Sequence, residues 1–278
     1  MKHLVLGLLL IPAPTFGGER DNVVLRAMSD ELARSMERLE MEELGKPHFA
    51  AYRVRDFRKL SLTGSFGALK DPYEERGRDV IVDLRVGTAN FDNSHYIGRD
   101  MWELRPHSAN MAVEENYDAL RFSLWSVTDR AYKQMVERLS QKKAYKNAKG
   151  IREEIPDLSR DEASGRLAEP MEAAFDRPAW EERVRRLSAV FRAYPGILQS
   201  EVQLQWTSRT VFFADSEGRR SRQPADEYEI VAEASAQAED GMMVSDRRRV
   251  LSRAIDEMPP MERLDSEVRR LAQDVSAM

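Results

Sequence analysis

Hydrophobic residues recur every three or four positions in four stretches of this chain, with charged residues between them. Gly45 and Pro47 would end the first of these stretches. In the second, Trp125 and Tyr132 extend the apolar stripe, so we expect both side chains to be buried. The spacing predicts amphipathic helices over residues 22–44, 117–146, 178–194 and 261–275.

Between these stretches, apolar and polar residues alternate, which is typical of half-buried β-strands. In Val80–Val86, for example, Val and Leu alternate with Ile, Asp and Arg. The sequence Asp215-Ser216-Glu217-Gly218 predicts a tight turn between two such strands. The alternation predicts strands over residues 49–55, 60–66, 80–86, 197–206, 210–214, 228–236 and 242–251.

One helix followed by three strands occurs twice, first from Asn22 and again from Pro178. This order predicts an α+β fold with antiparallel sheets and long amphipathic helices. The repetition is either an α-β-β-β pseudo-repeat or a chance similarity of two α+β units, because the identity between the copies is weak. Residues 151–177 are polar and would form a surface linker, so we expect one α+β unit over 22–150 and another over 178–278.

The first residues have the pattern of a signal peptide. Lys2 and His3 precede an apolar run from Leu4 to Ile11, which is followed by prolines and small residues. Cleavage after Gly17 would remove residues 1–17, and Ala13 is an alternative cleavage site. Two other interpretations of this segment are a buried N-terminal strand and a misassigned start codon. We therefore expect an exported, periplasmic protein without a membrane anchor, because the run is too short to span a bilayer.

Composition narrows the classes of function. The formal charge is −5, and the two signs are interspersed, so nucleic-acid binding has no electrostatic support. The chain has no cysteine, which excludes disulfides, thiolate nucleophiles and cysteine zinc sites. The core must therefore be held by packing alone.

No catalytic constellation stands out in the sequence. A zinc hydrolase usually has two histidines one helical turn apart, and His48, His95 and His107 lack that spacing. No nucleophile elbow or phosphate-binding loop is present. The paired carboxylates fall in predicted solvated helices or in the linker. We predict no catalytic, metal-binding or cofactor-binding residue in this chain.

One loop gathers polar groups directly after a strong strand, which is a common position for binding residues. It contains Asp92, Asn93 and His95, and we consider these three a candidate cleft or binding loop. The alternative is an Asx-type turn, in which the Asp92 side chain bonds the backbone of its own loop.

Several segments, spread over nearly the whole mature chain, resemble the N-terminal region of secreted TldD/PmbA proteins, the "modulator of DNA gyrase" metalloproteases. Their order and spacing carry the resemblance. They are PHFAAYRVRD (47–56), SFGAL (65–69), RDVIVDLRVGTANFDN (78–93), DALRFSLWSVTDRAYK (118–133), WEERVRRLSAVFRAY (180–194) and FADSEG (213–218).

The resemblance implies an α+β N-terminal domain, association with a paralogous subunit, and zinc-dependent peptide cleavage in an enclosed cavity. The family's zinc ligands, His-Glu-x-x-x-His and a distal Cys, belong to its C-terminal domain and have no counterpart here. We therefore expect a noncatalytic substrate-chamber and assembly domain whose partner is a C-terminal catalytic domain or a paralogous subunit. The alternatives are a gene whose end has been assigned too early, a split gene, or a stand-alone exported binding or scaffold protein.

If this domain precedes another, its C-terminal strand and helix would pack against the next domain. Their apolar residues would then lack part of their cover and favour self-association. These residues are Met242, Met243, Val250, Leu251, Leu264, Val268 and Leu271.

Overall fold

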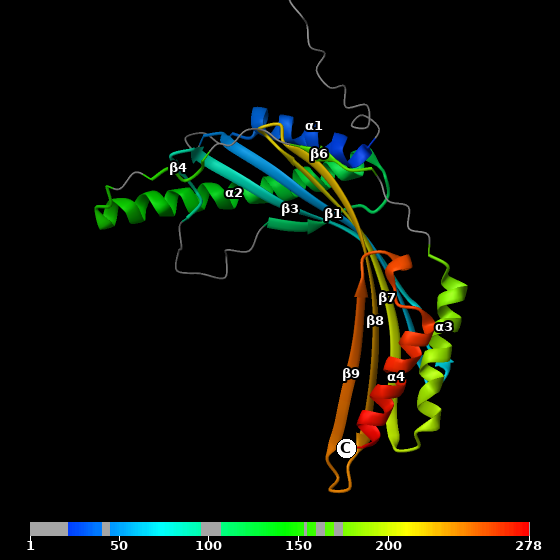
Figure 1. The fold of residues 1–278 in the computed structure, drawn as a ribbon. Helices are drawn as coiled ribbons and strands as arrows, with labels where there is room; N and C mark the ends of the chain where they lie inside the picture. Colours follow the sequence, from blue (N-terminus) through cyan, green and yellow to red (C-terminus); the bar gives the residue numbers. More distant parts are fainter. Residues whose placement is uncertain are drawn as a thin grey trace, which may run out of the picture.

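The structure is a computed structural model that describes residues 22–40, 45–95, 107–152, 155–159, 165–169 and 175–277. The proposed signal peptide lies outside the described residues. Figure 1 shows a long curved sheet with two helices packed near each of its ends. This confirms the predicted α+β class with a large antiparallel sheet and long helices.

The described residues form four α-helices and two short 3-10 turns. Side chains of Asn22, Asn116 and Asp176 cap the first three α-helices, each accepting a hydrogen bond from the backbone N–H three residues on. Gly150 ends the second in a left-handed conformation. The elements are α1 (Val23–Arg38), α2 (Tyr117–Lys149), α3 (Arg177–Ala189), η2 (Val190–Ala193), η3 (Ile255–Glu257) and α4 (Met261–Ser276).

Nine strands form one sheet in the described part of the chain. Its order is β4-β3-β1-β7-β8-β6, while β2 pairs with β1, β5 with β3 and β9 with β8. All pairings are antiparallel except that of β6 with β8. The strands are β1 (Pro47–Ser65), β2 (Ala68–Leu69), β3 (Tyr73–Thr88), β4 (Phe91–Asp92), β5 (His107–Asn110), β6 (Arg166–Leu167), β7 (Ile197–Asp215), β8 (Arg220–Gln237) and β9 (Met243–Ser252).

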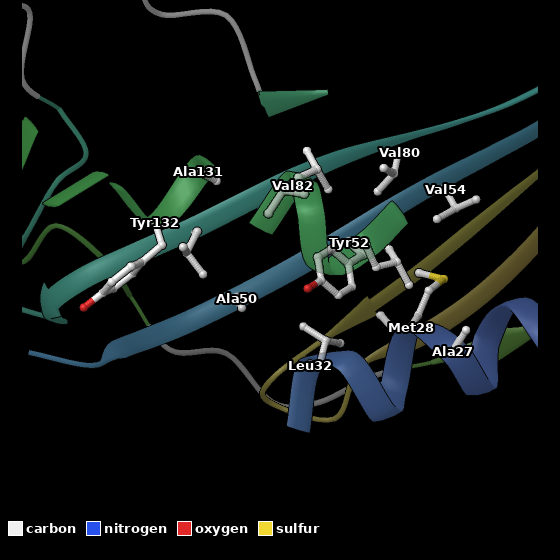
Figure 2. Packing of buried hydrophobic residues seen from close by; sticks show 14 of the residues in the cluster. Ala27, Met28, Leu32, Ala50, Tyr52, Val54, Val80, Val82, Ala131 and Tyr132 are labelled. Carbon is white, nitrogen blue, oxygen red and sulfur yellow. The ribbon is translucent and has the colours of Figure 1, made fainter. Parts of the chain in front are cut away.

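All four α-helices cover the same face of this sheet. Apart from Ile197, every strand residue in the two hydrophobic cores has an even number, because the registers place even residues opposite even residues. The first core joins α1 and α2 to one end of the sheet, and Tyr52 lies at its centre (Figure 2). The second joins α3 and α4 to the other end. Odd-numbered residues of β1, β3, β7, β8 and β9 form the opposite face, which we call the open face.

A polar belt separates the two cores on the helix-covered face. Arg78 of β3 is 3% exposed and pairs with Asp56 of β1. It also donates hydrogen bonds to the carbonyl oxygens of Ala112 at 3.0 Å and Glu114 at 3.3 Å. Because its hydrogen-bond partners are all within the fold, this buried charge is compensated and the strands continue through the belt.

Several details differ from the sequence-based expectations. The two strands expected over 49–55 and 60–66 are one strand, β1, and those expected over 197–206 and 210–214 are likewise one strand, β7. The polar residues between them alternate in step with the sheet, so they are paired strand rather than loop. The first helix ends at Arg38, earlier than expected.

The expected burial was wrong at several side chains. Tyr132 is buried, but Trp125 is 42% exposed, because α2 turns that position away from the sheet. Leu264, Val268 and Leu271 of α4 do not lack cover, since they belong to the second core. Met242, Met243 and Leu251 are exposed as expected.

The predicted division into two α+β units stays a prediction. Strand β1 of the first predicted unit pairs with β7 of the second over most of their length, from Ala51 opposite Asp215 to Gly64 opposite Val202. Among the described helices, none combines the length and apolar character needed to cross a membrane.

Candidate functional site

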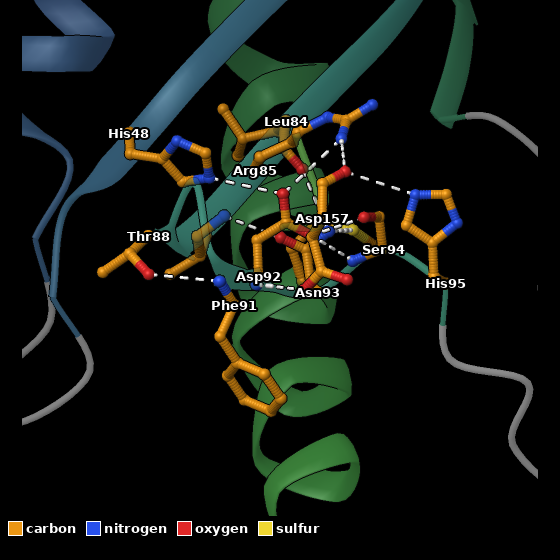
Figure 3. A network of polar contacts seen from close by, with 12 residues as sticks. His48, Leu84, Arg85, Thr88, Phe91, Asp92, Asn93, Ser94, His95 and Asp157 are labelled. Carbon is orange, nitrogen blue, oxygen red and sulfur yellow. Dashed lines mark hydrogen bonds and ion pairs between the residues drawn. The ribbon is translucent and has the colours of Figure 1, made fainter. Parts of the chain in front are cut away.

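The predicted polar loop lies where β4 meets α2 and the segment 155–159. Figure 3 shows Asp92 close to His48 and Ser94, and His95 directed at Asp157. The Asp92 carboxylate is fully buried, and its Oδ1 accepts hydrogen bonds from the backbone N–H of Ser94 at 2.7 Å and from the Ser94 hydroxyl at 2.5 Å. Its Oδ2 lies 3.3 Å from His48 Nε2 and 3.5 Å from Arg85 Nη1. The local geometry is that of an Asx turn.

These contacts control the protonation of Asp92. Burial acts to raise the pKa of this carboxyl group, but the hydrogen bonds from His48 and Ser94 and the charge of Arg85 outweigh burial and lower the pKa to about 2. The carboxylate is therefore ionised at neutral pH. An ionised carboxylate with these partners holds the loop in place and has little capacity left to act as a base.

Asn93 is also turned inward. Its Oδ1 accepts a hydrogen bond from the backbone N–H of Val86 at 2.6 Å, and its Nδ2 donates to the carbonyl oxygen of Leu84 at 3.2 Å. The same Nδ2 lies 2.8 Å from the sulfur atom of Met135 on α2. Asn93 thus joins the end of β3 to the helix beneath it.

His95 completes the predicted set and is exposed. It has a positive φ of 55°, and its Nε2 lies 3.3 Å from the carbonyl oxygen of Asp157. Asp157 also accepts a hydrogen bond from the backbone N–H of Asp92 and pairs with Lys142 of α2 at 2.5 Å. The segment 155–159 therefore closes the network, and sequence reasoning missed it because it had been assigned to the linker.

A cavity of about 400 Å³ lies beside this network. Asn93, Ser94 and His107 line it together with residues of β1 and β3, whereas Asp92 and His95 do not. Burial, followed by the charges of Arg138 and Arg130, lowers the pKa of His107. A binding role for the loop stays a prediction, and the structure places one of its three residues at a cavity.

The open face offers a much larger surface. No described helix packs on it, and its charged residues form pairs between neighbouring strands: Arg55 with Asp79 at 2.7 Å, Lys59 with Glu75 at 3.5 Å, and Arg249 with Glu229. Opposite charges therefore lie beside each other on neighbouring strands. Such a surface can form ion pairs with charged groups of a ligand and hydrogen bonds with its neutral polar groups.

Phe57 lies in the middle of the open face. Its ring covers Gly77 on β3, where an added Cβ would lie 2.5 Å from the ring, and both Arg55 and Lys59 are 5.4 Å from its centroid. Arg209 of β7 is opposite Phe57 in the register and is exposed. The arrangement provides an aromatic platform flanked by cations, which sequence reasoning missed because Phe57 falls between the two strands it expected.

The described histidines do not fit a zinc site. His48 contacts Asp92, His95 contacts a carbonyl oxygen, and His107 lies on β5 opposite Val82. Over the ranges that the structure describes, no group of three or more metal-ligating side chains is placed to hold a metal ion.

Comparison with known proteins finds similar solved structures at low sequence identity. No family model and no curated protein matches the sequence. This chain is similar in structure to proteins of the TldD/PmbA type. They include candidate modulators of DNA gyrase from Thermotoga maritima (11% identity, TM-score 0.45) and Bacteroides thetaiotaomicron (10%, 0.47) and TldE from Thermococcus kodakarensis (9%, 0.47).

These matches cover most of this chain but less than half of each structure. They cover 81%, 91% and 90% of this chain, and 44%, 47% and 47% of the Thermotoga, Bacteroides and Thermococcus proteins, respectively. The names agree with the resemblance seen in the sequence. At this identity the likeness concerns the path of the chain and assigns no activity, substrate or partner.

Proposed function

We propose that this chain is a noncatalytic domain that forms one wall of a peptide-holding chamber and assembles with a zinc-bearing peptidase domain or a paralogous TldD/PmbA-like subunit. The open face is the observation that carries the proposal. One side of a nine-stranded sheet is covered by four helices, whereas no described helix covers the other. The segments that resemble TldD/PmbA proteins supply the peptidase context.

The chemistry of the open face suits an extended peptide. Paired charges and amide side chains such as Gln203 and Gln205 can bond a peptide backbone or its polar side chains, and Phe57 can pack on apolar ones. None of these groups is specific for one sequence. A wall of this kind would hold varied peptides weakly and leave cleavage to the zinc-bearing partner.

A peptide-binding assay with the full chain tests whether the open face binds peptides. Fluorescein-labelled peptides from a digest of an unfolded protein are titrated with the chain, and anisotropy reports binding. Phe57→Ala and Arg209→Glu are each expected to weaken binding about fivefold, because each removes a contact worth about 1 kcal/mol. Phe122→Ala is the matched control, since Phe122 is 65% exposed but lies on α2. Binding that is absent, or that only the control weakens, would contradict the proposal.

A separate assay tests the proposal that this chain does not cleave peptides by itself. The same peptides incubated with the chain and added zinc should remain intact, and dialysed protein should contain no stoichiometric zinc. Cleavage that a chelator stops and that His107→Ala abolishes would refute this part. If a neighbouring reading frame encodes a protein with His-Glu-x-x-x-His, that protein should co-purify with this chain when the two are co-expressed. The resulting complex should cleave the peptides.

A further inference from the structure

Strand β9 forms an outer edge of the sheet within the described residues. It pairs with β8 on one side, from Met243 opposite Gln237 to Ser252 opposite Tyr228, and with no described strand on the other. Its side chains alternate strictly between exposed and half-buried from Met243 to Val250. Along an edge of ten residues, another strand could bond the backbone N–H and C=O groups that do not pair with β8. At Arg247 that strand would displace two side chains, because the N–H donates to Asp246 Oδ1 at 2.7 Å and the C=O accepts from Arg248 Nη1 at 3.2 Å.

The sequence of β9 is complementary to itself when read in the opposite direction. A two-fold axis perpendicular to the sheet keeps the helix-covered faces of two copies on the same side. Directly opposed residues of antiparallel strands point to the same face, so an odd-numbered residue can oppose only an odd-numbered one and an even-numbered residue only an even-numbered one. With the axis at Arg247, apolar residues oppose apolar residues. Asp246, which pairs with Arg248 of its own chain, also opposes Arg248 of the second copy. The resulting pairs are Met243 with Leu251, Val244 with Val250, Ser245 with Arg249, and Asp246 with Arg248.

The neighbouring registers lack this complementarity. An axis at Asp246 places Asp246 opposite itself and Arg248 opposite Val244. An axis at Arg248 places Arg247 opposite Arg249 and Asp246 opposite Val250. Like charges directly opposite each other destabilise a pair of strands, as does a charge opposite an apolar residue. Of these three registers, the one centred on Arg247 has a single conflict, between the two Arg247 side chains, and places no charged residue opposite an apolar one.

The remaining conflict in that register is between the two Arg247 side chains on the axis. Arg247 lies opposite Glu233 of β8 in the same chain, and both are exposed on the open face. Across the junction the charges would therefore run in the order acid, base, base, acid. The two carboxylates of Glu233 flank the arginine pair and offset its repulsion.

We propose that β9 pairs with β9 of a second copy of this chain, antiparallel and centred on Arg247, so that the two sheets join edge to edge. Backbone hydrogen bonds along the edge would supply affinity, and the side-chain pairs would set the register. The exposed Met243 and Leu251, both 54% exposed, would cover each other across the junction at two symmetric places. The open faces of the two copies become continuous. This inference concerns β9 and does not depend on peptide binding.

Cross-linking tests the register directly, because the chain has no cysteine. Arg247→Cys places a thiol opposite its own copy on the axis and should give a disulfide-linked dimer on mild oxidation. Ser245→Cys is the matched control. Its thiols would lie about 13 Å apart along the strand, beyond the reach of a disulfide. Cross-linking of both variants to the same extent, or of neither, would overturn the register.

A charge exchange tests the same contact without cross-linking. Met243→Glu alone and Leu251→Lys alone should each weaken dimerisation about tenfold in sedimentation, because each places a charge opposite an apolar residue twice per dimer. The double variant should restore it, since glutamate then opposes lysine. The two positions lie about 26 Å apart in one chain, so only an intermolecular contact can produce the rescue.

Circular dichroism of each variant checks that the monomer fold is kept, as expected for exposed positions. A wild-type chain that stays monomeric throughout the micromolar range would overturn the proposal. So would a dimer that the single variants leave intact, or one that the double variant fails to restore. A strand supplied by another protein instead of a second copy would give the same monomeric result for the pure chain.

Discussion

Asp92→Asn separates a structural role of the polar loop from a binding role. The change keeps the size of the side chain and removes its charge. Oδ2 is the atom that faces His48 and Arg85, and an amide nitrogen in that position cannot accept a hydrogen bond from either. If the carboxylate holds the loop, the variant must be less stable, whether or not a ligand is present.

The magnitude can be worked out from the lowered pKa. In the folded protein the pKa of Asp92 falls from 3.8 to about 2. Each pKa unit corresponds to about 1.4 kcal/mol, so the ionised form stabilises the fold by about 2 kcal/mol. For a carboxyl group whose folded pKa is depressed, this contribution is fully present above the pKa of the unfolded chain and is lost as the pH falls through the folded value. About half of it should remain at pH 3.

Urea unfolding at pH 7, 5 and 3, followed by tryptophan fluorescence, measures the difference between wild type and variant. We expect Asp92→Asn to lower the free energy of unfolding by about 2 kcal/mol at pH 7 and by about 1 kcal/mol at pH 3. Asp79→Asn is the control, because its ion pair with Arg55 is on the surface and should contribute less than about 1 kcal/mol. A variant as stable as wild type at every pH would refute the structural role and favour the binding role.

Three further predictions concern other parts of the chain. Glu31→Ala should lower the free energy of unfolding by about 3 kcal/mol in urea titrations, because Glu31 is 1% exposed and pairs with Arg34 at 2.5 Å and Arg121 at 3.0 Å. Gly87→Ala should cost at least about 2 kcal/mol in thermal unfolding, since its φ is 112° and an added Cβ would clash with the carbonyl oxygen of Phe91. Intact-mass measurement after periplasmic expression should show removal of about seventeen residues.

Each of these has its own control or contrary outcome. Glu37→Gln changes an exposed carboxylate on the same helix and should leave stability within about 0.5 kcal/mol. Gly196→Ala adds a Cβ where nothing lies within 4 Å, so it should be tolerated. Equal effects of each variant and its control would contradict the assigned contacts. Recovery of the protein with Met1 retained would contradict export.

The sequence alone determined the helices, the strand periodicity and the fold class. Helical spacing located α2 and α4 to within a few residues, because an amphipathic stripe is a local property. The turn at Asp215 was equally local: Oδ1 accepts hydrogen bonds from the backbone N–H of Glu217 and Arg219, and Gly218 supplies the positive φ. The alternation of β8 already indicated which residues would lie on each face.

The tertiary structure decided how these pieces combine. Polar residues such as Asp56 interrupted the apolar pattern and suggested a break in β1, whereas pairing with Arg78 compensates the charge and lets the strand continue. The contact between Asp92 and the segment around Asp157 joins residues 65 apart in the chain, so no local pattern could indicate it.

The same holds for the edge and the open face. Alternation in β9 shows that the strand has two faces, but it does not show that β8 is its neighbour or that its other edge is unpaired. Strand periodicity repeats every two residues in every strand, so it fixes the side to which each residue points and leaves the choice of neighbour undetermined. That choice depends on how the helices pack over the whole sheet, and only the folded chain contains that information.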